Sequence, residues 1–464
     1  MMRAALPPPP EEPPSMRSVA TPRAKPRLLV VGAGLAGCEA AWQAAERGVA
    51  VTLVEMKPER SSPAHVSSDF AELVCSNSLR ANGLANAVGL LKEEMRRLGS
   101  LVLRAADRTA VPAGRALAVD RVAFSRAVTE AVAAHPGVTI ERRVVTEVPR
   151  DGAAILATGP LTEPELARDL QRLLGEEHLY FYDAISPIVY ADSIDHAVAF
   201  RASRYDDGDG DYLNLPLDRE AYERFVSDLL EAEKVPLRAF EASLFFEGCL
   251  PIEEMARRGR DTLAFGPMKP VGLVDPRTGE RPHAVVQLRQ EDEIGALYNL
   301  VGFQTRLRIG EQQRVLRALP GLSKAVFARY GAVHRNTYVN APLRLTADLR
   351  LRARPGVRVA GQMTGVEGYV ESAAIGLLAG VFAAAEAHGE APVLPPETTA
   401  HGALLHHLQA ADPRRFQPTN VHYGLFPPLA ARPRRLARRE KNEQLAQRAL
   451  GALDGWRSRI GAAP

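Results

Sequence analysis

A glycine loop between an apolar strand and a helix constrains this chain more than any other feature. Residues 27–31 form an apolar run without polar alternation, which is typical of a buried parallel strand. The loop Gly32-Ala33-Gly34-Leu35-Ala36-Gly37 follows, and the pattern then predicts a helix over 35–47 and a strand over 50–54 that ends at Glu55. This strand–helix–strand order predicts a doubly wound, mostly parallel sheet of the α/β class.

The three glycines predict a nucleotide site. Gly32 permits the tight turn, Gly34 lets the backbone approach a pyrophosphate, and Gly37 lets the helix pack closely on the strand. The helix start offers free N–H groups and a positive dipole end to phosphates. Glu55, 18 residues after Gly37, is placed to accept a hydrogen bond from a ribose hydroxyl. In this setting the motif favours a nucleotide over a glycine-rich turn that binds nothing.

Two later glycine segments bear on which nucleotide is bound. Gly159 follows a predicted strand at 153–157, and Gly361-Gln362-Met-Thr364-Gly365 follows another at 357–360. The three-part arrangement resembles the Rossmann-like FAD domain of disulfide-reductase-like flavoproteins, in which the last segment brings a helix N-terminus toward the flavin ring. No second G-x-G-x-x-G occurs, so no separate NAD(P)H domain is visible, and no C-x-x-C points to a dithiol reductase.

Changes in composition along the chain predict its domains. Residues 1–26 hold eight prolines and are expected to be a disordered leader. Residues 27–165 and 345–464 are expected to form one discontinuous FAD-binding domain that ends in a basic tail. Between them, residues 166–344 change to turns, polar strands and short helices, which predicts an inserted, smaller α+β domain.

Charge and composition bound the function. The net charge is +3, but residues 412–459 carry 11 Lys/Arg against 4 Asp/Glu, which suits contact with a polyanion or, alternatively, a solvated helix with no partner. The best candidates for such a contact are Arg434, Arg435, Arg438 and Arg439. Three cysteines exclude a disulfide scaffold, and no apolar stretch approaches the ~20 residues of a membrane span, so a cytoplasmic protein is expected.

The three cysteines lie in different contexts. Cys38 lies behind Gly37 in the first helix, where a small packed residue is expected. Cys75 follows an apolar pair and precedes polar residues in Leu73-Val-Cys-Ser-Asn77. Cys249 lies just before a helix start at Pro251, where a thiolate can be stabilised. The residues alone make Cys75 and Cys249 candidates for catalysis without deciding between them.

Blocks across 27–430, in consistent order, resemble the TrmFO family of folate-dependent flavoprotein tRNA (uracil-5-)-methyltransferases, which are related to the MnmG flavoproteins. These blocks are residues 32–37, 73–80, 91–99, 118–121, 246–254, 297–304, 334–337, 361–372, 416–420 and 424–427.

The resemblance implies a transferase that forms 5-methyluridine in the T loop of tRNA. Its cofactors would be FAD, NAD(P)H and 5,10-methylenetetrahydrofolate as the carbon donor. The resemblance lets Cys249 be the nucleophile that adds to uracil C6 and Cys75 a base or a shield near the flavin, and the sequence does not fix which cysteine has which role. Thiolate addition makes uracil C5 a better nucleophile, which divides a difficult step in two.

Three alternatives stay open. The same chemistry could act on ribosomal RNA, the chain could be an FAD oxidoreductase for a small molecule, or it could be a flavin-containing RNA-binding protein without catalysis. The small-molecule oxidoreductase would leave the basic tail and both cysteine motifs unexplained, and the non-catalytic RNA-binding protein would leave the two cysteines without a role. No metal is expected, because His401, His406 and His407 lack partners at ligand spacing. No membrane and no stable protein partner are implied.

Overall fold

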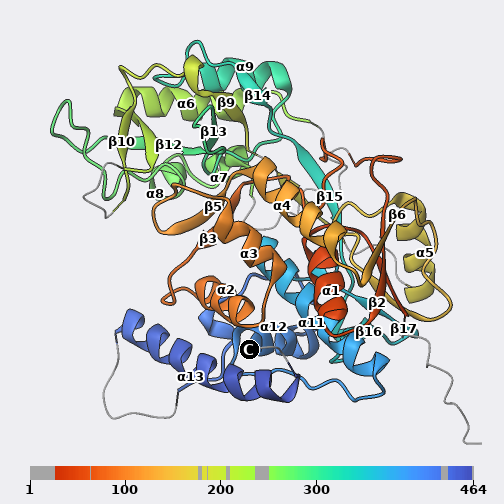
Figure 1. The fold of residues 1–464 in the computed structure, drawn as a ribbon. Coiled ribbons are helices and arrows are strands. Elements are labelled where there is room, and N and C mark those ends of the chain that lie inside the picture. Colours follow the sequence, from red (N-terminus) through yellow and green to blue (C-terminus); the bar gives the residue numbers. More distant parts are fainter. Residues whose placement is uncertain are drawn as a thin grey trace, which may run out of the picture.

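The computed structural model describes residues 27–62, 64–175, 180–184, 186–204, 210–235, 250–429 and 437–461. Within these residues, two six-stranded sheets each have their own cluster of buried apolar side chains. The second sheet lies at the top of the molecule and the first lies below it (Figure 1).

The first sheet is mostly parallel and joins distant parts of the chain. Its order is β16-β17-β7-β1-β2-β6, and only β16 runs antiparallel to its neighbour. Its strands are β1 (Arg27–Val31), β2 (Ala50–Glu55), β6 (Val138–Arg142), β7 (Ala153–Leu156), β16 (Arg350–Leu351) and β17 (Arg354–Val359). Because β17 pairs with β7, the start and the later part of the chain share one sheet, and the predicted α/β class is confirmed.

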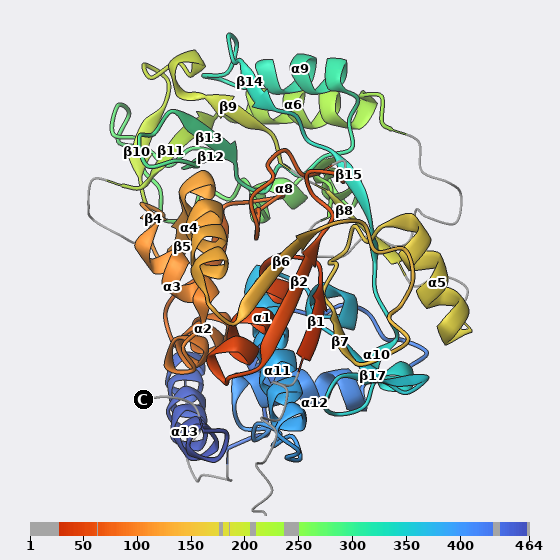
Figure 2. The same ribbon diagram turned by 45° about the vertical axis from the view of Figure 1, so that its right-hand side comes forward.

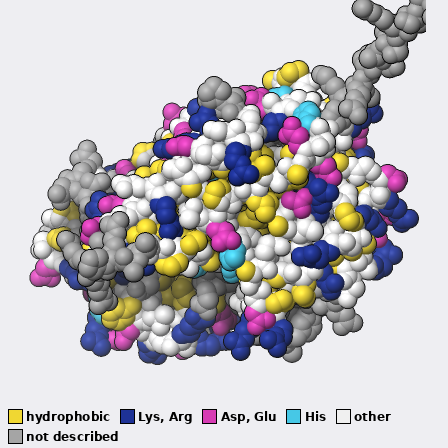
Figure 3. Space-filling model, turned by 90° about the horizontal axis from the view of Figure 1, so that it is seen from below, with side chains coloured by type: hydrophobic (Ala, Val, Ile, Leu, Met, Phe, Trp, Pro, Cys, Tyr) yellow, Lys and Arg dark blue, Asp and Glu magenta, His cyan; other side chains and the backbone are white. Residues whose placement is uncertain are grey.

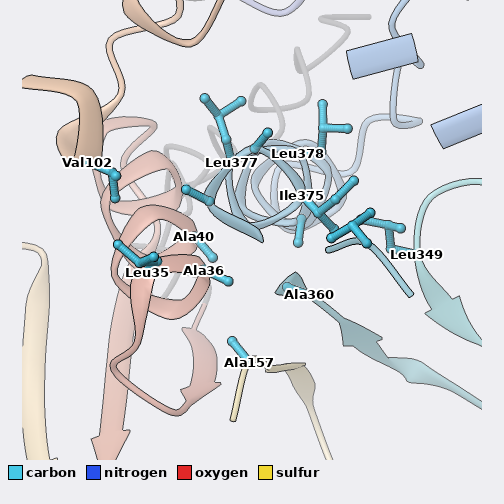
Figure 4. Packing of buried hydrophobic residues seen from close by; sticks show 14 of the residues in the cluster. Leu35, Ala36, Ala40, Val102, Ala157, Leu349, Ala360, Ile375, Leu377 and Leu378 are labelled. Atoms are coloured by element: carbon cyan, nitrogen blue, oxygen red, sulfur yellow. The ribbon is translucent and has the colours of Figure 1, made fainter. Parts of the chain in front are cut away.

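Two helices of small residues cover this sheet. The helix α1 (Leu35–Glu46) packs closely along α11 (Tyr369–Ala387), and Ala36 and Ala40 lie on the side of α1 that faces α11 (Figure 4). A Cβ at Gly376 would stand 2.3 Å from the Ala36 carbonyl oxygen, so only glycine allows this approach. By length and composition α11 could cross a membrane, but 83% of its apolar window is buried inside the structure, as in a core helix.

The second sheet is antiparallel throughout, in the order β10-β11-β12-β13-β9-β14. Its buried side chains pack against helices α6 and α7, an α+β arrangement as predicted. The strands are β9 (Ile188–Tyr190), β10 (Phe200–Ala202), β11 (Tyr212–Leu217), β12 (Ala284–Gln290), β13 (Leu297–Leu300) and β14 (Phe327–Arg329). The helices are α6 (Arg219–Glu231), α7 (Ile252–Arg257), α8 (Thr262–Phe265) and α9 (Ile309–Arg317).

Smaller elements complete the chain, and Figure 2 shows them from a second direction. A three-stranded sheet has the order β3-β5-β4, and β15 pairs with β8. These strands are β3 (Ser78–Ala81), β4 (Ala110–Val111), β5 (Ala116–Val119), β8 (Tyr180–Ala184) and β15 (Val333–Thr337). The other helices are α2 (Ala87–Arg97), α3 (Leu101–Arg108), α4 (Arg121–Ala134), α5 (Pro164–Leu174), α10 (Ala341–Arg344), α12 (Ala400–Ala410) and α13 (Arg438–Arg459). Short 3-10 helices are η1 (Ala191–Ser193), η3 (Gly361–Thr364) and η4 (Tyr423–Leu425).

The basic C-terminal segment forms a packed helix. In α13, Leu445, Ala449, Leu453 and Trp456 are buried at helical spacing, and the Trp456 indole N–H donates to the Val393 carbonyl at 2.8 Å. The helix contacts α2 at the lower end of the molecule (Figure 1). On the face seen from below, basic side chains are spread among acidic and apolar ones (Figure 3).

The predicted domain boundaries stay a prediction, but the buried contacts suggest a refinement. Leu166 and Leu170 of α5 and Val339 belong to the first apolar cluster, although the prediction assigns 166–344 to the insert. The second cluster extends only from Val189 to Ala325. The amphipathic side of α5 thus packs on the FAD-type core, which favours an insert that begins after α5.

Candidate active site

A cleft opens above the glycine loop, where β1, β2 and β7 end. Nine of the twelve residues predicted for the cofactor line it: Gly32, Ala33, Gly34, Leu35, Ala36, Glu55, Gly159, Gly361 and Gln362. The other three support the cleft from behind. Gly37 packs under Gly32, Thr364 donates a hydrogen bond to the Gly361 carbonyl at 2.8 Å, and Gly365 lies against Phe416.

The glycines of the loop have distinct geometric roles. Gly32 has φ +98°, and a Cβ there would stand 2.6 Å from the Ala157 carbonyl oxygen. A Cβ at Gly37 would stand 1.8 Å from the Gly32 carbonyl oxygen. Gly34 differs, since a Cβ there would meet no atom within 4 Å and would project into open space. This open space beside a helix start without a side-chain cap fits a phosphate group.

Glu55 holds the loop and borders the cleft. Its carboxylate accepts hydrogen bonds from the N–H of Ala33 at 2.8 Å and from the N–H of Lys57 at 3.0 Å. Each carboxylate oxygen has a further lone pair, so Glu55 can also accept from a ribose hydroxyl. Its place at the end of β2 is the one that the sequence pattern predicts for a dinucleotide site.

Several polar residues that line the cleft were missed in the sequence. His65 lies 2.6 Å from the Ser62 hydroxyl, and burial lowers the pKa of His65, with the nearby Lys57 acting in the same direction. Glu163 pairs with Arg60 at 2.5 Å. These residues lie in loops without a motif, and the only sequence signal is that Lys57 follows Glu55 closely.

Tyr369, the first residue of α11, contacts the segment that carries Cys75. Its hydroxyl oxygen accepts hydrogen bonds from the N–H groups of Cys75 at 2.8 Å and Ser76 at 3.2 Å, and it lies 2.9 Å from the Cys75 sulfur. Two donors occupy the two lone pairs, so the phenol proton is left for the sulfur. Burial, and then the charge of Cys75, raises the pKa of Tyr369, which therefore keeps this proton at neutral pH.

Arginines from both parts of the molecule surround this segment, which we call the Cys75 turn (residues 73–77). Arg121 donates to the Leu73 carbonyl at 2.5 Å and to Glu291 at 2.6 Å. Arg289 of β12 donates to the Ser76 hydroxyl at 2.7 Å and to the Asn77 side-chain oxygen at 2.9 Å. Arg121, Arg289 and Arg329 all interact electrostatically with Cys75.

The other two cysteines differ from Cys75. Cys38 is fully buried, its thiol donates to the Ala33 carbonyl at 3.3 Å, and burial, followed by Glu55 and Glu39, raises its pKa. It occupies the packing position expected of it, whereas Cys75 is partly exposed and Tyr369 beside it lines the cleft. Cys249 lies outside the described residues.

The predicted RNA-contacting arginines are only partly described. Arg438 and Arg439 are exposed at the start of α13, and Arg439 pairs with Glu443 at 2.9 Å. Arg434 and Arg435 lie outside the described residues. The Asn442 side chain donates to the Ala85 carbonyl at 2.9 Å, so the basic end of α13 lies beside the chain that continues from β3. Among the described residues, no group of three or more His, Cys, Asp and Glu could hold a metal ion.

Comparison with known proteins agrees with this architecture. The family model described as Glucose inhibited division protein A matches residues 27–391. The structure of GidA from Aquifex aeolicus superimposes with a TM-score of 0.68 at 16% identity, covering 95% of this chain and 74% of that one. A second crystal form of GidA gives a TM-score of 0.67, with 77% of that chain covered. Fold and cleft thus define a dinucleotide-binding α/β protein of the GidA class.

Sequence relatives narrow this class. A protein of Geotalea uraniireducens is 60% identical over 433 residues, covering 93% of this chain and 99% of the relative. A protein of Geobacter sulfurreducens is 59% identical over 430 residues, with 92% and 98% covered. Both are named methylenetetrahydrofolate–tRNA-(uracil-5-)-methyltransferase TrmFO. The chain belongs to the TrmFO family.

Proposed function

We propose that this protein transfers a one-carbon unit from 5,10-methylenetetrahydrofolate to C5 of a uracil in the T loop of tRNA. The observation that supports it most directly is full-length identity of up to 60% to enzymes named for this reaction. Neither a small-molecule oxidoreductase nor a flavin-containing RNA-binding protein without catalysis is favoured by these relatives. The rival substrate, ribosomal RNA, appears in none of their names.

The residues of the cleft suit FAD. The open space at Gly34 would take the pyrophosphate, and Glu55 would accept from the ribose. The start of η3 at Gly361 and Gln362 borders the same cleft and would lie near the flavin ring. FAD, when bound, supplies the reducing equivalents that NAD(P)H provides and that complete a methyl group.

Two cysteines divide the work on the uracil. The Cys249 thiolate adds to C6, which forms a C–S bond and leaves C5 nucleophilic enough to bond to the incoming carbon. Loss of the C5 proton then restores the C5–C6 double bond and breaks the C–S bond, which releases the thiolate. Cys75 takes the C5 proton or shields the flavin. The Tyr369 hydroxyl supports this role, because it lines the cleft, lies 2.9 Å from the Cys75 sulfur and can donate a hydrogen bond to it.

Capture of RNA that contains 5-fluorouridine tests these roles, because the fluorine stalls the reaction after thiolate addition. Cys249→Ala should lose the covalent complex, whereas the matched Cys38→Ala should keep both the complex and methyl transfer. Capture that persists in Cys249→Ala and disappears in Cys75→Ala would exchange the two roles. Flavin absorbance of each variant is checked first, and nucleoside analysis of tRNA for 5-methyluridine tests the reaction itself.

The remaining assignments complete the proposal. The FAD-binding domain is discontinuous, an inserted domain carries Cys249, and the protein works in the cytoplasm.

Arg434, Arg435, Arg438 and Arg439 contact tRNA phosphates. Replacing Arg438 and Arg439 with alanine should reduce the slope of log K against log salt concentration for tRNA binding by up to about two units. Each phosphate contact that is lost lowers the number of counterions released on binding by about one. An unchanged slope would assign the contact elsewhere.

A further inference from the structure

An aromatic side chain stands outside the second apolar cluster. Phe265 ends α8 with 84% of its side chain exposed, whereas Leu263 and Met268 on either side of it are fully buried. An exposed ring of this size costs free energy in water, and its burial by a partner returns that free energy. The ring is therefore available for contact with a partner on the second part of the molecule.

The backbone that presents Phe265 is held firmly. The buried Tyr222 hydroxyl donates to the Arg260 carbonyl at 2.6 Å and accepts from the Ala264 N–H at 3.2 Å. The Met268 N–H donates to the Leu263 carbonyl at 2.9 Å, and the Val285 N–H of β12 donates to the Met268 carbonyl at 2.9 Å. The ring is thus presented outward by a fixed turn, which reduces the ordering cost of binding.

Between Glu254 and Asp275, the sequence on either side of the ring holds more basic than acidic residues. Residues 255–274 hold four Lys/Arg (Arg257, Arg258, Arg260 and Lys269) and one acidic residue, Asp261. Arg257, Arg258 and Arg260 are all exposed. Arg257 pairs with Glu254, and Arg260 donates to the Ser227 hydroxyl at 2.5 Å, so these cations are already ordered next to α8.

We propose that Phe265 is a stacking platform for an unpaired nucleotide of the RNA substrate, with Arg258, Arg260 and Lys269 contacting the flanking phosphates. An aromatic ring among cations matches the two faces of a single-stranded nucleotide, a flat base and a charged backbone. A base-paired duplex offers phosphates but no free base face. The position also suits the chemistry, since α7, which contacts α8, begins three residues after Cys249 in the sequence.

This inference rests on the proposed function, and tRNA binding by single variants tests it. Phe265→Ala should raise the Kd for tRNA about 5- to 100-fold at every salt concentration, with the salt slope unchanged, because stacking releases no counterions. Phe265→Tyr should bind like the wild type. Lys269→Gln should instead flatten the slope by about 0.7 unit, the value for a single-stranded contact. Ile294→Ala, at a side chain 86% exposed, is the matched control and should change neither.

A direct readout is the fluorescence of Phe265→Trp, which tRNA should quench and a fully paired RNA duplex should not. Ile294→Trp should be quenched by neither. The proposal is overturned if Phe265→Ala binds tRNA as tightly as the wild type, or if Phe265→Tyr binds as weakly as Phe265→Ala. Equal quenching of Phe265→Trp by duplex and by tRNA would also overturn it and would indicate a phosphate contact only. If the wild type forms no 5-methyluridine in tRNA, the proposed function fails instead, which is a separate result.

Discussion

The glycine loop and the Cys75 turn border the same cleft but are held by different kinds of contact. The loop belongs to one β1–α1–β2 unit, and its hydrogen bond to Glu55 joins residues 22 positions apart. The Cys75 turn is held by Tyr369, 294 residues away, and by Arg289, 213 residues from Ser76. The conformation of the glycine loop is therefore fixed by contacts within its own stretch of sequence. The conformation of the Cys75 turn depends on how both parts of the molecule pack against it.

The largest effect is expected at the loop. Gly34→Val should yield colourless protein, because the side chain would fill the open space assigned to the pyrophosphate. Its thermal stability should match that of flavin-free wild type, since φ is −74° and no atom lies within 4 Å of the new Cβ. Flavin absorbance and melting temperature measure the two effects.

Gly32→Ala provides the contrast, because φ of +98° and the 2.6 Å approach to Ala157 should also destabilise the protein itself. Full flavin occupancy in Gly34→Val would show that the loop does not hold the cofactor.

The next effect is expected at the Cys75 turn. Tyr369→Phe removes the hydroxyl that accepts from two N–H groups and that can donate to the Cys75 sulfur. Methyl transfer should fall roughly 10- to 100-fold, within the usual contribution of proton-transfer groups, while flavin content stays normal. Alkylation of Cys75 by iodoacetamide at pH 7 should slow as well. An unchanged alkylation rate would mean that the tyrosine only packs.

These two sites differ in how far the sequence predicts them. The strand, loop, helix and acid from Arg27 to Glu55 follow one another directly, so pattern and glycine chemistry predicted β1, α1 and the cleft above them. Nothing near Cys75 in the sequence indicates Tyr369 or Arg289, because these contacts arise only when β12 and α11 pack against the turn. Likewise, the basic composition of α13 gave no sign of the buried Trp456.

Asn77 connects the turn to both parts of the molecule. Its side-chain N–H groups donate to the carbonyls of Val119 and Gln290 at 2.9 Å each, and its oxygen accepts from Arg289. Asn77→Ala should lower the free energy of unfolding by about 2–4 kcal/mol, because it leaves buried partners unsatisfied. Denaturant unfolding measures this. Asn442→Ala, which loses one partly buried hydrogen bond, is the control and should cost about 1 kcal/mol. An equal loss of unfolding free energy in the two variants would show that Asn77 contributes no more to stability than Asn442 does.

The smallest effect concerns Lys92 of α2, whose buried amine donates to the carbonyls of Leu79 and Arg80 at 3.0 and 2.9 Å and so holds β3 just beyond the Cys75 turn. Burial, and then Arg96 and Arg80, lowers the pKa of Lys92 to about 7. Between pH 7 and the ordinary pKa of 10.5, the unfolded chain binds more protons than the folded one, so stability from this group rises with pH. Below pH 7 the amine is protonated in both the folded and the unfolded protein, so the free energy needed to bury its charge no longer changes with pH.

Lys92→Met removes this titration. The stability of the wild type relative to Lys92→Met should therefore rise from pH 7 to pH 9 by up to about 1 kcal/mol per pH unit, and it should be constant below pH 7. Unfolding by urea at pH 6, 7, 8 and 9 measures the difference. A difference that does not change with pH would mean that the lysine stays charged in the folded protein, paired with groups such as Asp107 and Glu371 that favour the cation.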